Sequence, residues 1–166
     1  MPGRRGGATV ANLRAGAVAG TLATGLMSAV MLGAKRIGLM GEMPPETITA
    51  RFLDRLGWHH RSGETQDLLA VVTHVGFGAA AGSLYAVIQR RLRPPVPPVV
   101  AGMVFATGVW LVSYQGWVPA LGIMAPATRD RPGRPQSMLV AHLVFGVVLG
   151  ALLGRPARGR ERRGPE

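Results

Sequence analysis

The chain has 166 residues, of which 48% are hydrophobic and only 16% are charged, and its formal net charge is +11. The charged residues are clumped, with long uncharged stretches between the clumps. This pattern argues against an ordinary soluble domain, because a soluble surface needs interspersed charges. The chain has no cysteine, so disulfides, thiolate metal sites and thiol nucleophiles are also excluded.

Two uncharged stretches, residues 15–34 and 68–89, lie in the first half of the chain. A helix needs roughly 20 mostly apolar residues to cross about 30 Å of hydrocarbon, so each stretch predicts one membrane-spanning helix. Neither has the polar face that a helix of a soluble bundle would show. The first stretch is longer than the apolar part of a signal peptide, so we expect an uncleaved span.

The loop between these two spans predicts a short amphipathic helix near residues 46–57. Ile48, Phe52 and Leu56 follow one another at intervals of four residues and therefore share one helix face. Trp58 comes directly after them, and tryptophan is enriched at membrane interfaces. We expect this helix to lie on the outer surface of the membrane.

Two adjacent histidines, His59 and His60, end this loop. Together with Glu64 or Asp67 they could bind a metal ion. Histidines in loops are usually only solvated, so we predict no metal site here.

The third uncharged stretch, residues 94–128, is too long for one span and too short for two with a turn. Its prolines, at positions 94, 95, 97, 98 and 119, place a span near 99–118, and an apolar loop at 121–127 follows. Trp110, Tyr114 and Trp117 fall on one side of this span, as a packing face that ends in an interfacial aromatic belt. A fourth span is expected near 137–154, followed by a basic, disordered tail at 155–166.

The distribution of charges predicts the orientation of the spans. One side of the membrane would carry eleven arginines and two acids, in the N-terminus, the 90–93 loop and the C-terminal tail. The other side would carry eight cations and six acids. Because cytoplasmic loops are the ones enriched in Lys and Arg, we expect both termini in the cytoplasm. The arginines of the tail have no interleaved aromatic residues to stack on bases, so no nucleic-acid partner is expected.

A nine-residue pattern, H-x-x-F-G-x-x-x-G, occurs at 74–82 and again at 142–150. The first and third spans both open with Ala-Gly, at Ala15-Gly16 and Ala101-Gly102. These matches predict a two-span unit written twice, in residues 1–93 and 94–154. Because each unit has two spans, the repeat would be parallel, with its axis near the membrane normal.

Small residues four apart on a helix lie nearly above one another and let two helices approach closely in lipid. Glycines at such spacing predict helix-packing faces on all but the third span, where Gly102 precedes Ala106. The predicted packing residues are Gly16, Gly20, Gly78, Gly82, Gly146, Gly150 and Gly154.

His74 and His142 stand at the head of two of these glycine faces, and a histidine inside a membrane is a functional hypothesis by default. Three interpretations remain open. The imidazoles could form structural hydrogen bonds that hold helices together, or they could sense or relay protons. They could also ligate a haem between the second and fourth spans. We prefer the structural interpretation and predict no cofactor.

No enzyme motif is present: the chain has no G-x-S-x-G, no H-E-x-x-H and no phosphate-binding loop. We therefore expect no catalysis.

Three features resemble the YagU-like group of small bacterial inner-membrane proteins of unknown function. They are the glycine-rich first span AGAVAGTLATGLMSAVMLGAKR, the loop MPPETITARFLDRLG, and the pattern H-x-x-F-G-x-x-x-G-x-x-Y from His74 to Tyr85. The fourth span keeps the histidine and glycines but has Leu153 in place of the tyrosine. The resemblance implies a helical protein of the bacterial inner membrane and assigns no functional residue.

The sequence thus predicts an all-α polytopic membrane protein with four transmembrane helices in a 2+2 repeat and one interfacial amphipathic helix. Its expected role is that of a structural or accessory protein that packs through its glycine faces, with the lipid bilayer and a homo-oligomer or a larger complex as partners. The alternatives are a small transporter, channel or pH-sensing protein that uses His74 and His142, and a haem-binding protein.

Overall fold

The computed structural model describes residues 3–58, 62–92 and 94–154, with side chains from residue 10 onward. This part of the chain is helical and contains no strand. Four helices are long and apolar enough to cross a membrane, namely Val10–Arg36, Gly63–Leu92, Pro98–Ala120 and Arg134–Leu153. The predicted all-α class and the four spanning helices are confirmed. His59, His60 and the tail at 155–166 lie outside the described residues.

The helices follow one another with short connections. Their bounds are α1 (Gly3–Arg36), α2 (Pro44–Arg55), α3 (Gly63–Leu92), α4 (Pro98–Trp110), η1 (Leu111–Trp117), α5 (Val118–Ala120), η2 (Ala127–Arg129) and α6 (Arg134–Leu153). The segments α4, η1 and α5 form one continuous span.

The helices extend beyond the predicted spans because helical hydrogen bonding continues into the charged flanks. α1 ends after Lys35 and Arg36, and Gly38 then adopts a positive φ of 82°. The N–H of Leu39 donates to the carbonyl of Ala34 over 2.9 Å. This is the usual glycine-dependent end of a helix, in which a left-handed residue satisfies the last carbonyls. An uncharged stretch is therefore shorter than the helix that contains it.

The third span contains a turn of π-helix, η1, that the sequence analysis did not predict. The backbone of Gly116 departs from helical geometry there, with φ −103° and ψ −105°. Pro119 lies three residues further on; it has no N–H to donate and its ring crowds the carbonyl one turn earlier. A widened turn accommodates such a proline, and π-turns of this kind are frequent at functional sites.

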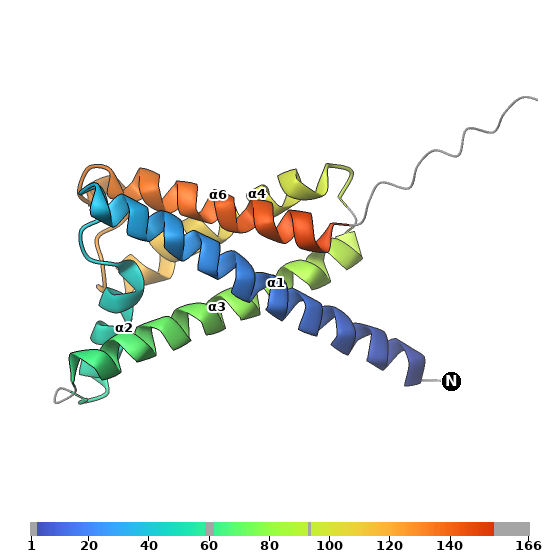
Figure 1. The fold of residues 1–166 in the computed structure, drawn as a ribbon, viewed down its shortest axis with the longest axis horizontal. Coiled ribbons are helices and arrows are strands. Elements are labelled where there is room, and N and C mark those ends of the chain that lie inside the picture. The colour runs from blue at the N-terminus through green and yellow to red at the C-terminus, as the bar shows by residue number, and fades with distance from the viewer. Residues whose placement is uncertain (1–2, 59–61, 93, 155–166) are drawn as a thin grey trace, which may run out of the picture.

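The four spans form an open arrangement in which α1 and α6 pack against each other at the centre. α3 crosses α1 on one flank, and α4 packs along α6 on the other (Figure 1). The flanking helices α3 and α4 have no extensive contact with each other. The start of α1 and the end of α6 lie at one end of the molecule, and α2 packs on α3 at the other end.

The α1–α3 crossing brings backbone against backbone at four glycines. A methyl group on Gly16 would lie 2.6 Å from the carbonyl oxygen of Gly82, and one on Gly20 would overlap the carbonyl of Gly78. No side chain fits between the helices at these points. The crossing therefore requires glycine on both helices, which is how small residues permit close packing in lipid.

The α4–α6 pair has the same kind of contact. A methyl group on Gly102 would overlap the carbonyl of Gly146, and one on Gly150 would lie 2.6 Å from the α-carbon of Val99. Pro98 takes the place of a glycine at this second contact, where its carbonyl faces Gly150. The predicted packing glycines of the spans thus lie at helix crossings within the chain.

A polar cluster joins the spans at the α2 end. The hydroxyl of Tyr114 donates to Asp130, and Arg134 forms an ion pair with the same carboxylate at 3.2 Å. The side chain of Asp130 is 6% exposed and that of Arg134 is 14% exposed. The Nε of Arg134 also donates to the carbonyl of Met40 over 2.8 Å. One ion pair therefore connects α6, the π-turn and the loop after α1.

We expect Gly20→Ala to lower the free energy of unfolding by roughly 1–3 kcal/mol, because the added methyl group overpacks the α1–α3 crossing. Gly25→Ala on the same helix is the matched control, because nothing lies within 4 Å of a side chain placed there. Denaturant-induced unfolding in detergent, followed by circular dichroism, measures both variants. Equal stability of the two variants would show that the crossing is looser than described.

We expect Arg134→Met to lower the free energy of unfolding by about 3 kcal/mol, because it leaves the Asp130 carboxylate buried without its cation. Lys35→Met is the control. Lys35 pairs with Glu46 at 3.7 Å, but both side chains are more than 40% exposed, and exposed pairs contribute at most about 1 kcal/mol. Unfolding of both variants in the same detergent provides the comparison. A loss no larger in Arg134→Met than in Lys35→Met would contradict a structural role for the cluster.

Candidate functional site

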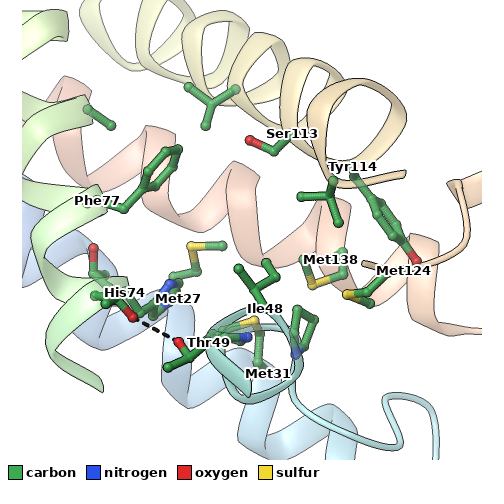
Figure 2. A pocket seen from close by; sticks show the side chains of 18 of the residues that line it. Met27, Met31, Ile48, Thr49, His74, Phe77, Ser113, Tyr114, Met124 and Met138 are labelled. Carbon is green, nitrogen blue, oxygen red and sulfur yellow. Dashed lines mark hydrogen bonds between the residues drawn. The ribbon is translucent and has the colours of Figure 1, made fainter. Parts of the chain in front are cut away.

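A cavity of about 460 Å³ lies between α3 and α4, on the flank where these two helices make little contact apart from Tyr85 with Pro98 and Phe105. α1 and α6 form its floor, α3 and the α4–η1 span form its walls, and α2 covers one end (Figure 2). The cavity is partly open to the outside. Its volume is within the range of small-molecule sites, about 300–1,000 Å³.

α2 is positioned over the cavity by polar contacts to both walls. The hydroxyls of Thr49 and Thr73 lie 3.0 Å apart and connect α2 to α3. Arg55 donates to the carbonyl of Leu121, just beyond the third span. Ile48, Phe52 and Leu56 all line the cavity from α2, and Phe52 and Leu56 are also 43% and 69% exposed. The apolar face predicted for this helix thus lines the cavity, together with Thr49 and Leu53, which are buried.

The cavity lining is overwhelmingly apolar. Four methionines, Met27, Met31, Met124 and Met138, contribute to it, and methionine is flexible enough to adapt to ligands of different shape. Trp117 adds an aromatic wall. None of the described residues that line the cavity is charged. An apolar molecule would therefore enter this cavity without losing favourable contacts with water. A charged molecule would lose its hydration and find no partner in the lining.

Most hydroxyl groups of the lining already bond within the protein. Thr24 donates to the carbonyl of Gly20 over 2.7 Å, and Thr73 donates to the carbonyl of Leu69 over 2.8 Å. The hydroxyl of Tyr114 is used by Asp130. Ser113, which lies on the π-turn, extends toward the cavity in Figure 2. The polar capacity of the cavity is thus limited to a few groups.

His74 and His142 come from different helices and line the same cavity. The Nδ1 of His142 lies 2.8 Å from the carbonyl oxygen of Met138, within its own helix. The Nε2 of His74 is buried and has no hydrogen-bond partner. His74 also borders a second hollow of about 300 Å³, which Glu46 and Asp67 line on the far side. The structure therefore brings the two predicted histidines to one cavity. Neither imidazole forms a hydrogen bond to a described residue of another helix.

Other predicted residues lie around this cavity and not inside it. Of the seven packing glycines only Gly78 lines it, and the rest form the crossings that hold its walls. Within the described chain no group of three His, Cys, Asp or Glu residues is placed to hold a metal ion. The methionine lining was not predicted from the sequence, although Met27 and Met31 lie one turn apart. Ser113 was not predicted to line a site either, because the π-turn that presents it has no clear sequence pattern.

The model of one protein family, described as a family of unknown function, DUF6789, matches residues 10–163. No curated protein and no solved structure is similar enough to match the chain. The resemblance to the YagU-like group gains no support from these comparisons. Because the family match covers all four spans and almost the entire sequence, the chain belongs to the DUF6789 family of unknown function.

Proposed function

We propose that this protein binds an apolar small molecule, which enters the cavity between α3 and α4 directly from the bilayer. The observation that carries this proposal is a partly open, uncharged cavity of about 460 Å³ within the span region of the molecule. In a membrane, the surroundings of such an opening are lipid tails and not water. A hydrocarbon ligand therefore reaches the cavity without first dissolving in water.

The lining supports reversible binding of a flexible chain. Methionine side chains reshape around a ligand at low cost, and Phe77 stands at the rim with 49% of its surface exposed. α2 covers one end of the cavity through the Thr49–Thr73 contact and the Arg55–Leu121 contact. A protein with this site would sequester, present or carry a membrane-dissolved molecule.

A purely structural or accessory role has less support from the contacts. The glycine faces that would have packed against other proteins are occupied within the chain, at the α1–α3 and α4–α6 crossings. Haem ligation also fits poorly, because the propionates of haem are charged and no described lining residue is a cation. A proton-relay or channel role remains without a specific observation in its favour.

We also infer that the chain is a parallel 2+2 repeat. Gly20 faces Gly78 as Gly102 faces Gly146, and both second glycines belong to the H-x-x-F-G-x-x-x-G pattern. These contacts pair Gly20 with Gly102, one turn later than the Ala-Gly alignment of the sequence. A two-fold axis would then require α3 to pack on α4 as α1 packs on α6. The cavity lies where that fourth contact would be.

We further infer that both termini are cytoplasmic and that the cavity opens in the outer half of a bacterial inner membrane. The support is the excess of arginine at the terminal end of the molecule, together with the position of α2 at the other end.

We expect Val109→Phe to abolish saturable binding of an apolar probe, because Val109 lines the cavity and the larger ring fills it. The assay uses a variant in which Trp58 and Trp110 are replaced by Phe, so that Trp117 in the cavity reports alone. In nanodiscs, 1-bromohexadecane should quench its fluorescence saturably. Val112 is 66% exposed on the same span and lies outside the cavity. Val112→Phe is therefore the control and should leave quenching unchanged.

Three outcomes would contradict the proposal. Quenching that rises linearly with probe, as for a tryptophan that only meets lipid, would show that no binding site exists. Unchanged quenching in Val109→Phe would place the probe elsewhere. A protein that is a stable dimer with Trp117 buried in the dimer contact would assign the cavity to a second copy instead.

Reporter fusions should show the C-terminus and the N-terminus in the cytoplasm, and a reporter inserted after Trp58 should be active outside it. Alkaline phosphatase and green fluorescent protein fusions at the three positions measure this. Active phosphatase at the C-terminus would reverse the orientation and place the cavity in the inner half.

A further inference from the structure

We infer that the ligand is an uncharged amphiphile that carries a hydroxyl group, such as a long-chain alcohol or phenol, and that this hydroxyl donates to the Nε2 of His142. This inference rests on the proposed function and adds the chemistry of the head group. It follows from the protonation of His142, from the shortage of other polar groups, and from the absence of charge in the lining.

The contact between His142 and Met138 determines which ring nitrogen is free. A carbonyl oxygen can only accept, so the Nδ1 of His142 is the donor in the 2.8 Å contact with Met138. In the neutral imidazole the Nε2 then has no proton and acts as an acceptor. No described residue bonds to this atom. The Nε2 of His142 can therefore accept a hydrogen bond from a ligand that carries a donor.

The side chain of His142 belongs to the wall of the cavity. His142 is only 8% exposed, and it stands on the cavity face of α6 between Met138 and Phe145, which line the same cavity. Its Nδ1 edge faces its own helix, so the Nε2 edge is directed away from the helix. An acceptor that faces an apolar cavity without a partner is costly, and a ligand hydroxyl would remove that cost.

The other polar groups of the cavity suit one small head group and no more. Thr24, Thr73 and Tyr114 spend their hydroxyl protons on protein acceptors. The Nε2 of His74 is a buried ring nitrogen without a partner, and Ser113 extends toward the cavity. A hydroxyl both donates and accepts, so it can use His142 as acceptor and either of the others as donor.

The absence of charged side chains from the described lining predicts an uncharged head group. None of the described lining residues is Lys, Arg, Asp or Glu. A phosphate, carboxylate or ammonium group would enter the cavity without a counter-ion, and an unpaired buried charge is far more costly than an unpaired hydroxyl. Phospholipid head groups and ionised fatty acids are therefore excluded from the polar end of the site.

Competition between matched probes tests this inference. In the single-Trp117 protein, hexadecane, 1-hexadecanol and hexadecyl phosphate each displace 1-bromohexadecane, and recovery of Trp117 fluorescence gives their relative affinities. We expect the alcohol to bind roughly tenfold more tightly than the alkane, which corresponds to one hydrogen bond to a buried acceptor. The phosphate should be the weakest competitor.

His142→Leu should bring the alcohol and the alkane to equal affinity while 1-bromohexadecane still quenches Trp117, which shows that the variant folds. Ser137→Ala is the control, because Ser137 is buried on the same helix but does not line the cavity; it should keep the preference.

The outcomes separate this inference from the proposed function. If 1-bromohexadecane binds but alcohol and alkane compete equally in the unmodified site, the head-group inference is wrong and the apolar site stands. The inference is also overturned if His142→Leu retains the preference or if the phosphate binds best. If 1-bromohexadecane shows no saturable quenching, the proposed function itself fails.

Discussion

Two helix crossings in which backbone lies directly against backbone determine where every other element of this protein lies. At the α1–α3 and α4–α6 crossings, a single methyl group on Gly20 or Gly102 would overlap a carbonyl of the opposite helix. Lipid tails are as apolar as leucine, so helix association in a bilayer depends on such close packing and not on the hydrophobic effect. The crossings produce two rigid pairs. The pairs meet chiefly through α1 and α6, with a smaller contact between Tyr85 of α3 and Pro98 and Phe105 of α4, so part of the other flank stays open.

Much of this fold could be predicted from the sequence, because in a membrane the period and the charge of a helix are tightly constrained. Uncharged stretches located all four spans, and glycines such as Gly20 and Gly78 marked contact faces. The helix ends differed, because hydrogen bonding in α1 continues through Lys35 and Arg36 to the glycine that terminates it. The π-turn before Pro119 was not predicted, since a proline signals a distortion but not its form.

The site was harder to predict than the fold, because a cavity depends on which helices fail to touch. His74 and His142 were recognisable as unusual residues, yet the sequence does not tell that they line one volume. A symmetric bundle of the kind that the H-x-x-F-G-x-x-x-G pattern suggests would pack α3 on α4 where the cavity now lies. Asymmetry between the two pairs, unlike periodicity, has no local sequence signal. The sequence signal for the cavity lining was limited to Met27 and Met31, which lie one turn apart and have flexible side chains.

The open flank makes the membrane itself a component of the folded state. A molecule that occupies the cavity binds the native structure and not the unfolded chain, so it adds to stability by mass action in proportion to the logarithm of its concentration over its Kd. Two bilayers of equal thickness but different content of such a molecule would then hold the same chain at different unfolding temperatures. If the cavity binds such a molecule, its occupancy contributes to the difference between the stability measured in detergent and the stability in the native membrane.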